Sequence, residues 1–243
     1  MRTRPLTPEE KRALEAAVGD AFRVLWLEGF GSKWRTARLM FANAKLRLTM
    51  REAYEVHRSV IQWKARFSED KVPDQAIGLD PLTTRLMGWV MQSWKRVEFF
   101  NTFLAGTLAP RIQLDLLPGI ACAAHFTLMA EREPQSIDDY VEAGRALQRF
   151  WLTATRLGLQ LQPEMTPLIF SRYVRNDLKF TEDDSIRNKA AQLAAELNKL
   201  LDPSPTSRAI FMGRIGAGPV AQARSLRLSV KRLMTRSATT PPF

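Results

Sequence analysis

The chain has little of the chemistry on which most catalytic and metal sites depend. Its 243 residues include one cysteine and two histidines. Cys122 alone cannot form an intramolecular disulfide or a cysteine-rich metal site, and His57 and His125 are too few for most histidine-based metal centres. A Walker loop, a Gly-x-Gly-x-x-Gly fingerprint and a Gly-x-Ser-x-Gly elbow are also missing. We therefore expect no metal site and none of these catalytic arrangements.

Long hydrophobic runs are lacking as well. A membrane-spanning helix needs roughly 20 apolar residues in succession. The best candidate, residues 114–130, is interrupted by Asp115, Pro118, Gly119 and His125. The first residues lead into a polar segment, which is not typical of a signal peptide. The sequence thus predicts a soluble, cytoplasmic protein that does not have a membrane as a partner.

Positive charge is abundant, with 36 lysines and arginines against 25 acidic residues and a formal net charge of +11. Such a surface favours anionic partners but identifies none of them. The basic residues are mostly arginine and are spread along the chain, without the dense runs of a nucleic-acid-binding tail. An arginine-rich soluble protein is the favoured interpretation, and no recognised module indicates nucleic acid as a partner.

The composition is that of a globular protein, with 45% apolar and 25% charged residues. We see no repeat and no break in composition, so we expect one domain over residues 1–236 and a disordered tail over residues 237–243. Hydrophobic periodicity, caps and turn residues predict a helix-rich α+β fold. The expected helices are 8–18, 33–47, 49–67, 82–104, 136–157 and 183–201, and the expected strands are 22–27, 120–129 and 209–215.

Few polar residues are candidates for a functional site. His125 lies in the expected buried strand and is more often, in such a place, a hydrogen-bonded core histidine; Cys122 beside it is expected to be inert. The loop 162–166 follows a long helix and could offer backbone amides to a flat polar ring, although an ordinary connection is the favoured reading. Arg224 and Arg227 follow a Gly/Pro turn, where they suit bidentate phosphate binding or simply continue a solvated basic tail.

Two stretches resemble the flavin nitroreductase family. One runs from Ala143 to Leu159 and continues into Gln162-Pro163, which is similar to a long central helix with a Gly-Leu turn and a loop that packs on the flavin. The other joins Phe211-Met212-Gly213-Arg214-Ile215-Gly216 to Arg224-Ser225-Leu226-Arg227, which looks like the last strand and the basic phosphate-contacting segment. More closely, Trp63 to Trp94 resembles nitroreductase-like domains that are fused to a ThiF-type adenylating domain.

This resemblance implies a mixed sheet flanked by long helices, dimerised through them, with FMN in the dimer interface. It implies an NAD(P)H-dependent oxidoreductase that passes electrons through FMN to an electron-poor small molecule, so that the flavin and not a catalytic triad performs the chemistry. By motif position, Arg224 and Arg227 would bind the phosphate. Pro163, Glu164, Met165 and Thr166 would lie near the isoalloxazine.

The sequence departs from that family at its beginning. The Arg-Ser-x-Arg helix that grips the FMN phosphate and the Asn-x-Gln-Pro-Trp segment after it are not found. The domain is therefore expected to be incomplete at its N-terminus, with FMN binding that depends on a homodimer or on a partner supplying the missing half. The alternative is a non-catalytic, truncated nitroreductase-like interaction subunit that docks a partner chain.

Overall fold

The computed structural model describes residues 3–104 and 106–234 and shows a helix-rich α+β fold, as predicted. Its centre is a four-stranded sheet in the order β1-β5-β7-β6. These strands are Phe22–Leu27, Ala124–Ala130, Ala209–Ala217 and Leu159–Pro163, respectively. All neighbours in this sheet are antiparallel, whereas two further ladders of two residues each are parallel.

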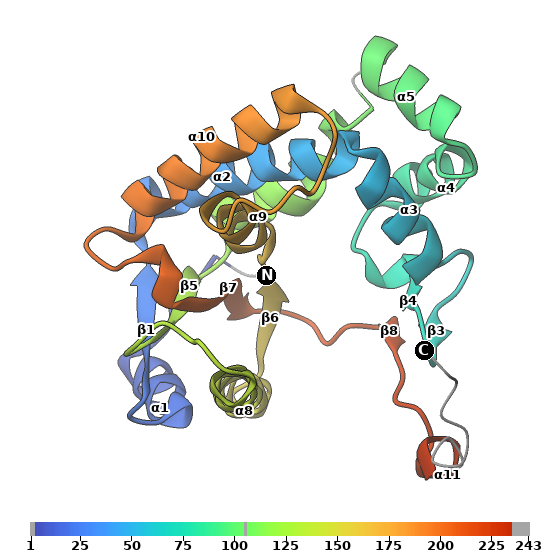
Figure 1. Ribbon diagram of the computed structural model, residues 1–243. Helices are drawn as coiled ribbons and strands as arrows, with labels where there is room; N and C mark the ends of the chain where they lie inside the picture. Colours follow the sequence, from blue (N-terminus) through green and yellow to red (C-terminus); the bar gives the residue numbers. More distant parts are fainter. Residues whose placement is uncertain (1–2, 105, 235–243) are drawn as a thin grey trace.

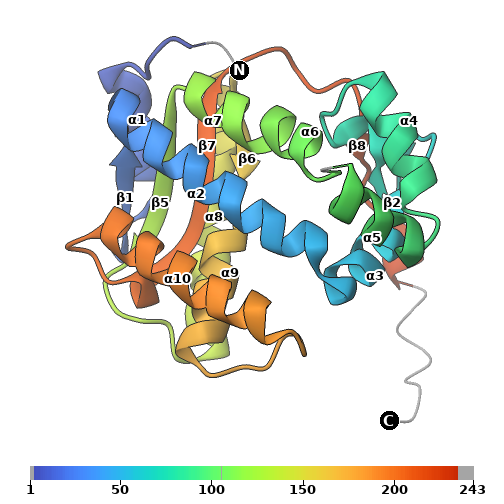
Figure 2. The same cartoon turned by 90° about the horizontal axis from the view of Figure 1, so that it is seen from above.

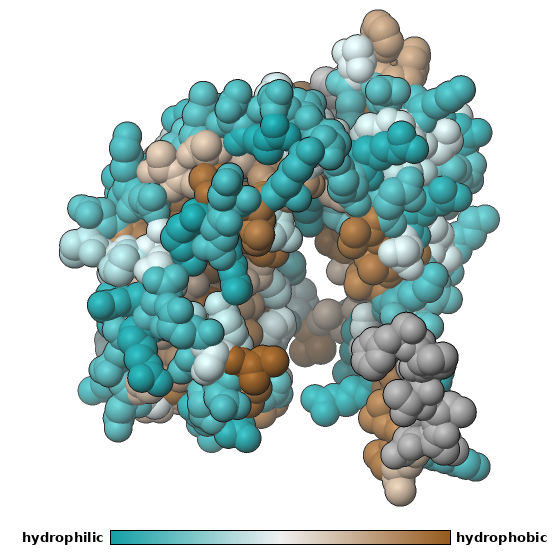
Figure 3. All heavy atoms as spheres, in the orientation of Figure 1, coloured by the Kyte–Doolittle hydropathy of each residue, from teal (hydrophilic) through white to brown (hydrophobic). Residues whose placement is uncertain are grey.

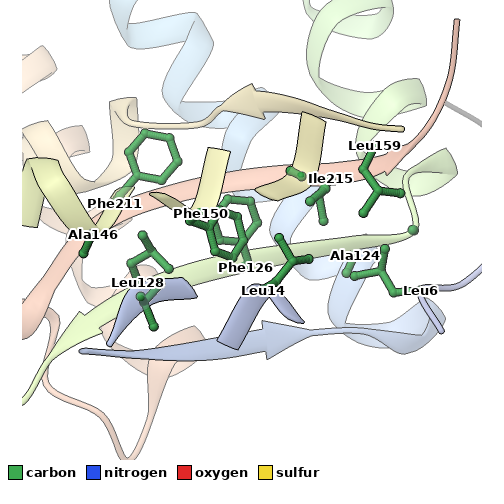
Figure 4. Packing of buried hydrophobic residues seen from close by; sticks show 13 residues of the cluster. Leu6, Leu14, Ala124, Phe126, Leu128, Ala146, Phe150, Leu159, Phe211 and Ile215 are labelled. Atoms are coloured by element: carbon green, nitrogen blue, oxygen red, sulfur yellow. The ribbon is translucent and has the colours of Figure 1, made fainter. Parts of the chain in front are cut away.

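One face of the sheet packs on α1 (Pro8–Val18) and α8 (Ile137–Arg156), which lie side by side below it in Figure 1. Strand side chains alternate between faces, so Phe126 and Leu128 of β5 point to these helices together with Phe211 and Ile215 of β7. Figure 4 shows this core, in which the ring centroids of Phe126 and Phe150 are 4.7 Å apart.

The opposite face is covered by α2 (Gly29–Thr49), α9 (Thr166–Arg175) and α10 (Asp184–Leu201). Figure 2 shows α2 crossing over the sheet with α10 beside it. Met212 of β7 belongs to this second core, as expected for the neighbour of Phe211 in an alternating strand. The sheet is therefore sandwiched between two helical layers, with an apolar core on each side.

A smaller lobe extends from the end of α2. It contains α3 (Arg51–Val60), α4 (Pro81–Val90) and α5 (Trp94–Phe103), around a small core of Tyr54, Met91 and Val97. The segment between α3 and α4 forms the short elements β2 (Ile61–Gln62), β3 (Phe67–Ser68), β4 (Val72–Pro73) and η1 (Asp74–Ala76). Asp74 fixes this segment because its carboxylate accepts from the backbone amides of Lys64 and Ala65.

The chain returns to the sheet through α6 (Leu108–Arg111), the π-helical turn η2 (Ile112–Leu116) and α7 (Leu117–Ala121). This return segment lies close against α2. A Cβ placed on Gly119 would be 2.8 Å from the Cβ of Ala37, so only glycine allows α7 to approach α2 this closely.

The C-terminal residues leave the sheet and cross to the smaller lobe. After η3 (Thr206–Arg208) and β7, residues 218–223 lead to β8 (Arg224–Ser225), which pairs with β3, and then to α11 (Val230–Met234). We call residues 218–234 the C-terminal arm. Figure 1 shows it spanning the space between the two parts of the molecule.

Several predicted elements need correction. The single helix 82–104 is two helices, because the chain turns at residues 91–93 and α5 begins after Ser93. The helix 49–67 stops at Val60, and its capping box at Thr49 is absent, since that hydroxyl donates back to the carbonyls of Lys45 and Leu46. The strand 120–129 is helical up to Ala121 and becomes β5 only at Ala124.

The remaining helix and strand predictions hold within a few residues. The disordered tail predicted over residues 237–243 lies outside the described residues. Within residues 3–104 and 106–234, no helix is both long enough and apolar enough to cross a bilayer.

Candidate functional site

The sheet carries two buried charged side chains on its α2-facing side. His125 of β5 and Arg214 of β7 stand directly opposite each other in the antiparallel register. Both are buried, His125 completely. Charged groups inside a core need partners, because unpaired burial is very costly.

Glu164 is the partner of both. It follows Pro163, the last residue of β6, and its side chain is 1% exposed. One carboxylate oxygen lies 2.6 Å from Nδ1 of His125, and the other accepts from Arg214 at 2.9 Å. The three side chains form one ionic network, here called the buried triad.

The two basic residues of the buried triad also hold the return segment. Arg214 donates to the carbonyl of Leu114 at 2.8 Å, and Nε2 of His125 lies 2.9 Å from the carbonyl of Gly119. A carbonyl oxygen can only accept, so Nε2 carries a proton, while the carboxylate of Glu164 favours a second proton on Nδ1. His125 is therefore held as an imidazolium without a free lone pair, which excludes it as a general base or metal ligand in this geometry.

The pKa values follow this arrangement. Burial alone would lower the pKa of His125, but the charge and hydrogen bond of Glu164, together with the contribution of Cys122, outweigh burial and raise that pKa to about 10. Burial opposes ionisation of Glu164 too, yet His125 and Arg214 together lower its pKa. The triad is thus ionised across the neutral range, and the prediction of a satisfied core histidine is confirmed.

Asp115 of the return segment interacts electrostatically with Arg214 and Glu164 of the buried triad and with Arg47 of α2, which in turn affects His57. Burial raises the pKa of Asp115 to about 6 against the opposing charges of Arg47 and Arg214, and burial together with Arg47 lowers the pKa of His57 to about 4. Asp115 makes no hydrogen bond or close ion pair with any described residue, and Nε of Arg47 is likewise buried without a partner there. Among the described residues, no group of three or more His, Cys, Asp or Glu is placed to hold a metal ion.

The predicted ring-contacting residues lie at the turn from β6 into α9. Pro163 is exposed, Met165 is partly buried between the two cores, and Thr166 begins α9. Glu164 is committed elsewhere: its carboxylate belongs to the buried triad, and its backbone amide donates to the carbonyl of Met212 at 2.8 Å.

The predicted phosphate-binding residues lie on the C-terminal arm. Arg224 and Arg227 are both exposed, and neither guanidinium has a hydrogen-bonding or ionic partner among the described residues. The backbone beneath them is well anchored. The amide of Arg224 donates to the carbonyl of Arg66, and that of Leu226 donates to the carbonyl of Ser68.

One copy of the chain does not bring the residues of the β6–α9 turn and the two arginines of the C-terminal arm together. Pro163 pairs with Gly213, whereas the arm leaves the sheet after Ala217, which pairs with Leu159 at the other end of β6. That strand has five residues and is roughly 13 Å long. Figure 3 shows the molecule hollowed between the sheet layers and the smaller lobe, on the side that the arm crosses.

The residues that could hold the phosphate end of FMN are the two arginines of the C-terminal arm. Both guanidinium groups are exposed and have no partner among the described residues, and arginine is a residue type that binds phosphate monoesters. The ring end fits less well within a single copy, because both polar groups of Glu164 are already used. Pro163, Met165 and Thr166 leave accessible surface there.

Comparisons of the chain with models of known protein families, with curated proteins and with solved structures find no match. The geometry described above is therefore the basis for any functional proposal.

Sequence reasoning missed the buried triad, although signals for it were present. Arg214 lies inside the apolar run Ala209–Ile215, and His125 lies in an earlier apolar strand. A polar or charged side chain in such a place is expected to need a buried partner. The identity of the partner was not visible, because Glu164 is 39 residues from His125 and 50 from Arg214 along the chain.

Proposed function

We propose that the chain is an FMN-dependent oxidoreductase that uses NAD(P)H to reduce an electron-poor small molecule. The observation that carries this proposal is the pair Arg224 and Arg227, which is exposed and unpartnered among the described residues on an anchored backbone. The resemblance of the sequence to flavin nitroreductases supports the same assignment.

The anchoring favours ligand binding because the backbone has little conformational freedom left to lose when a ligand binds. The hydroxyl of Ser225 donates to the carbonyl of Lys71, and the guanidinium of Arg66 donates to Gln222 through both its backbone and its side-chain oxygen. Arg224 and Arg227 would hold the phosphate through bidentate, charge-assisted bonds. FMN, when bound, would supply the hydride chemistry, as cofactors generally do.

The chain's own residues would bind and orient the cofactor. Pro163, Met165 and Thr166 would provide a wall for the ring, and the separation of these residues from the arm favours a site completed by a second copy or by a partner chain. The buried triad would keep the β6–α9 turn in place, since Glu164 fastens it to β5 and β7.

A flavin-binding experiment tests this proposal. We expect added FMN to give flavin absorption bands that persist after desalting, and a double variant Arg224→Ala/Arg227→Ala to weaken FMN binding at least about tenfold. Each lost charge-assisted bond is worth about 1.5–3 kcal/mol. The matched control removes two exposed arginines elsewhere, Arg12→Ala/Arg145→Ala, and should bind FMN as the unaltered chain does. Equal binding by both double variants, or none by the unaltered protein, would refute the proposal.

A second candidate is a non-catalytic subunit that docks a partner chain. It is favoured by the smaller lobe, where Leu82 and Phe103 are largely exposed and Trp89 and Phe99 are about half exposed. Exposed apolar patches of this kind are characteristic of interaction surfaces. A folded protein that binds no FMN, yet is monomeric alone and forms a stable complex with another chain, would favour this candidate over the oxidoreductase.

A further inference from the structure

The hairpin of α4 and α5 borders an open pocket of about 180 Å³. Its walls come from these two helices, from the end of α2 at Leu48 and from Pro110 of α6. The lining is mainly apolar, and its principal side chains are Leu86, Met87, Val90, Met91, Val97 and Phe100. This pocket is separate from the C-terminal arm and from the β6–α9 turn.

The polar residues of the wall already have partners within the protein. Asn101 donates its side-chain amide to the carbonyl of Leu48 at 3.0 Å, and the hydroxyl of Thr83 donates to Asp80. The hydroxyl of Thr107 accepts from Arg111. Ordered water needs two to four polar partners, so the pocket favours an apolar occupant held by dispersion and by burial of its surface.

The size of the pocket limits that occupant. An engineered protein cavity of about 150 Å³ lined by Leu, Ile and Phe stays dry and binds benzene. The pocket here is slightly larger and has Phe100 in its wall, which allows edge-to-face contact with a second ring. Met87 and Met91 add adaptable thioether contacts, which suit an aromatic edge.

We infer that the α4–α5 pocket binds a compact, uncharged molecule with a single aromatic ring. The inference does not depend on FMN, because none of the pocket residues belongs to the proposed flavin site. Leu86 is 45% exposed at the rim, so a ring can enter from solvent without opening the helices.

Fluorobenzene is a suitable probe, observed by its ¹⁹F resonance during titration with the full-length chain. We expect a saturable change in shift or line width. Leu86→Trp should fill the pocket and weaken binding at least about tenfold. Leu82→Trp is the matched control, because it places the same ring one turn away on the same helix, outside the pocket wall.

A second variant tests the inference independently in case Leu86→Trp does not fold. Ala109→Phe adds a ring from the α6 side, at an exposed residue of the wall, and should also weaken binding, with an unchanged circular-dichroism spectrum. Absence of saturable binding to the unaltered chain, or equal binding by Leu86→Trp and Leu82→Trp, would overturn the inference. So would an apparent affinity that falls as protein concentration rises, since the pocket would then be filled by another copy. Loss of FMN binding in the arginine variants would leave this result unaffected.

Discussion

Replacing Glu164 by alanine removes the carboxylate that forms ion pairs with both His125 and Arg214. Its carboxylate is almost fully buried and makes two charge-assisted contacts, at 2.6 and 2.9 Å. Removing one partner of a buried ion pair costs about 3–5 kcal/mol, because the remaining charge is left without compensation. We therefore expect Glu164→Ala to lower the free energy of unfolding by about that amount at pH 7, as measured by urea denaturation followed by circular dichroism.

Glu164→Gln removes the negative charge of the side chain and keeps its shape. The amide oxygen can still accept from Arg214, but the amide nitrogen then faces the protonated Nδ1 of His125, donor against donor. A loss of about 1–3 kcal/mol is expected, as for a buried hydrogen-bonding group left unsatisfied. An exposed ion pair is the control: Glu142→Ala breaks the contact with Arg145 and should cost less than about 1 kcal/mol.

The pH dependence of the stability difference is an independent test of the ionised triad. Because Glu164 raises the pKa of His125 in the folded state, the resulting stability is fully present below the ordinary histidine pKa of about 6.5 and is lost as pH rises through the raised value. The difference between the unaltered chain and Glu164→Ala should therefore shrink at alkaline pH. A cost below about 1 kcal/mol at pH 7, with a difference that does not change with pH, would refute the ionised triad.

Two further perturbations address the return segment. Gly119→Ala should destabilise the fold by about 1–3 kcal/mol in thermal or urea unfolding, because its Cβ would lie 2.8 Å from that of Ala37; unchanged stability would contradict the close packing of α7 on α2. Asp115→Asn should stabilise the protein at pH 7, since the buried carboxyl has a raised pKa of about 6, so its contribution to stability is lost as pH rises through that value. Unfolding at pH 5 and pH 7 measures this effect, and a variant that is destabilised at pH 7 but not at pH 5 would show that the charge is needed.

The sequence predicted those elements whose signals are local. The capping box of α1 is present as expected, with Glu10 accepting from the amide of Thr7 and the hydroxyl of Thr7 accepting in return. The helix beginning after Ser136 has the same device, completed by Asp139. Caps act within one turn, so the local sequence predicts them where a helix does begin. The capping box predicted at Thr49 is absent because α2 continues to that residue.

Elements that depend on distant contacts were predicted less well. Helical spacing continues from Leu82 to Leu104, yet the chain turns at residues 91–93 because Met91 and Val97 both pack on Tyr54 of α3. Periodicity cannot distinguish one long helix from two that fold against a third element. The proposed flavin contacts at Pro163, Met165 and Thr166 and at the two arm arginines stay predictions for the same reason, since their relative placement depends on the fold and on any second chain.

The buried triad also explains why the smaller lobe keeps its place beside the sheet. The return segment leads the chain from that lobe back to the sheet through η2 and α7. Arg214 and His125 of the triad bind the carbonyls of Leu114 and Gly119 in this segment. Glu164 in turn fixes both cations. Disrupting Glu164 should therefore loosen the return segment and the α4–α5 hairpin before the sheet itself unfolds, because the core of the smaller lobe has three buried side chains among the described residues, Tyr54, Met91 and Val97. Amide hydrogen exchange in Glu164→Gln should then accelerate in residues 81–121 while β5 and β7 remain protected; uniform acceleration throughout the chain would instead show that the triad stabilises the fold only as a whole.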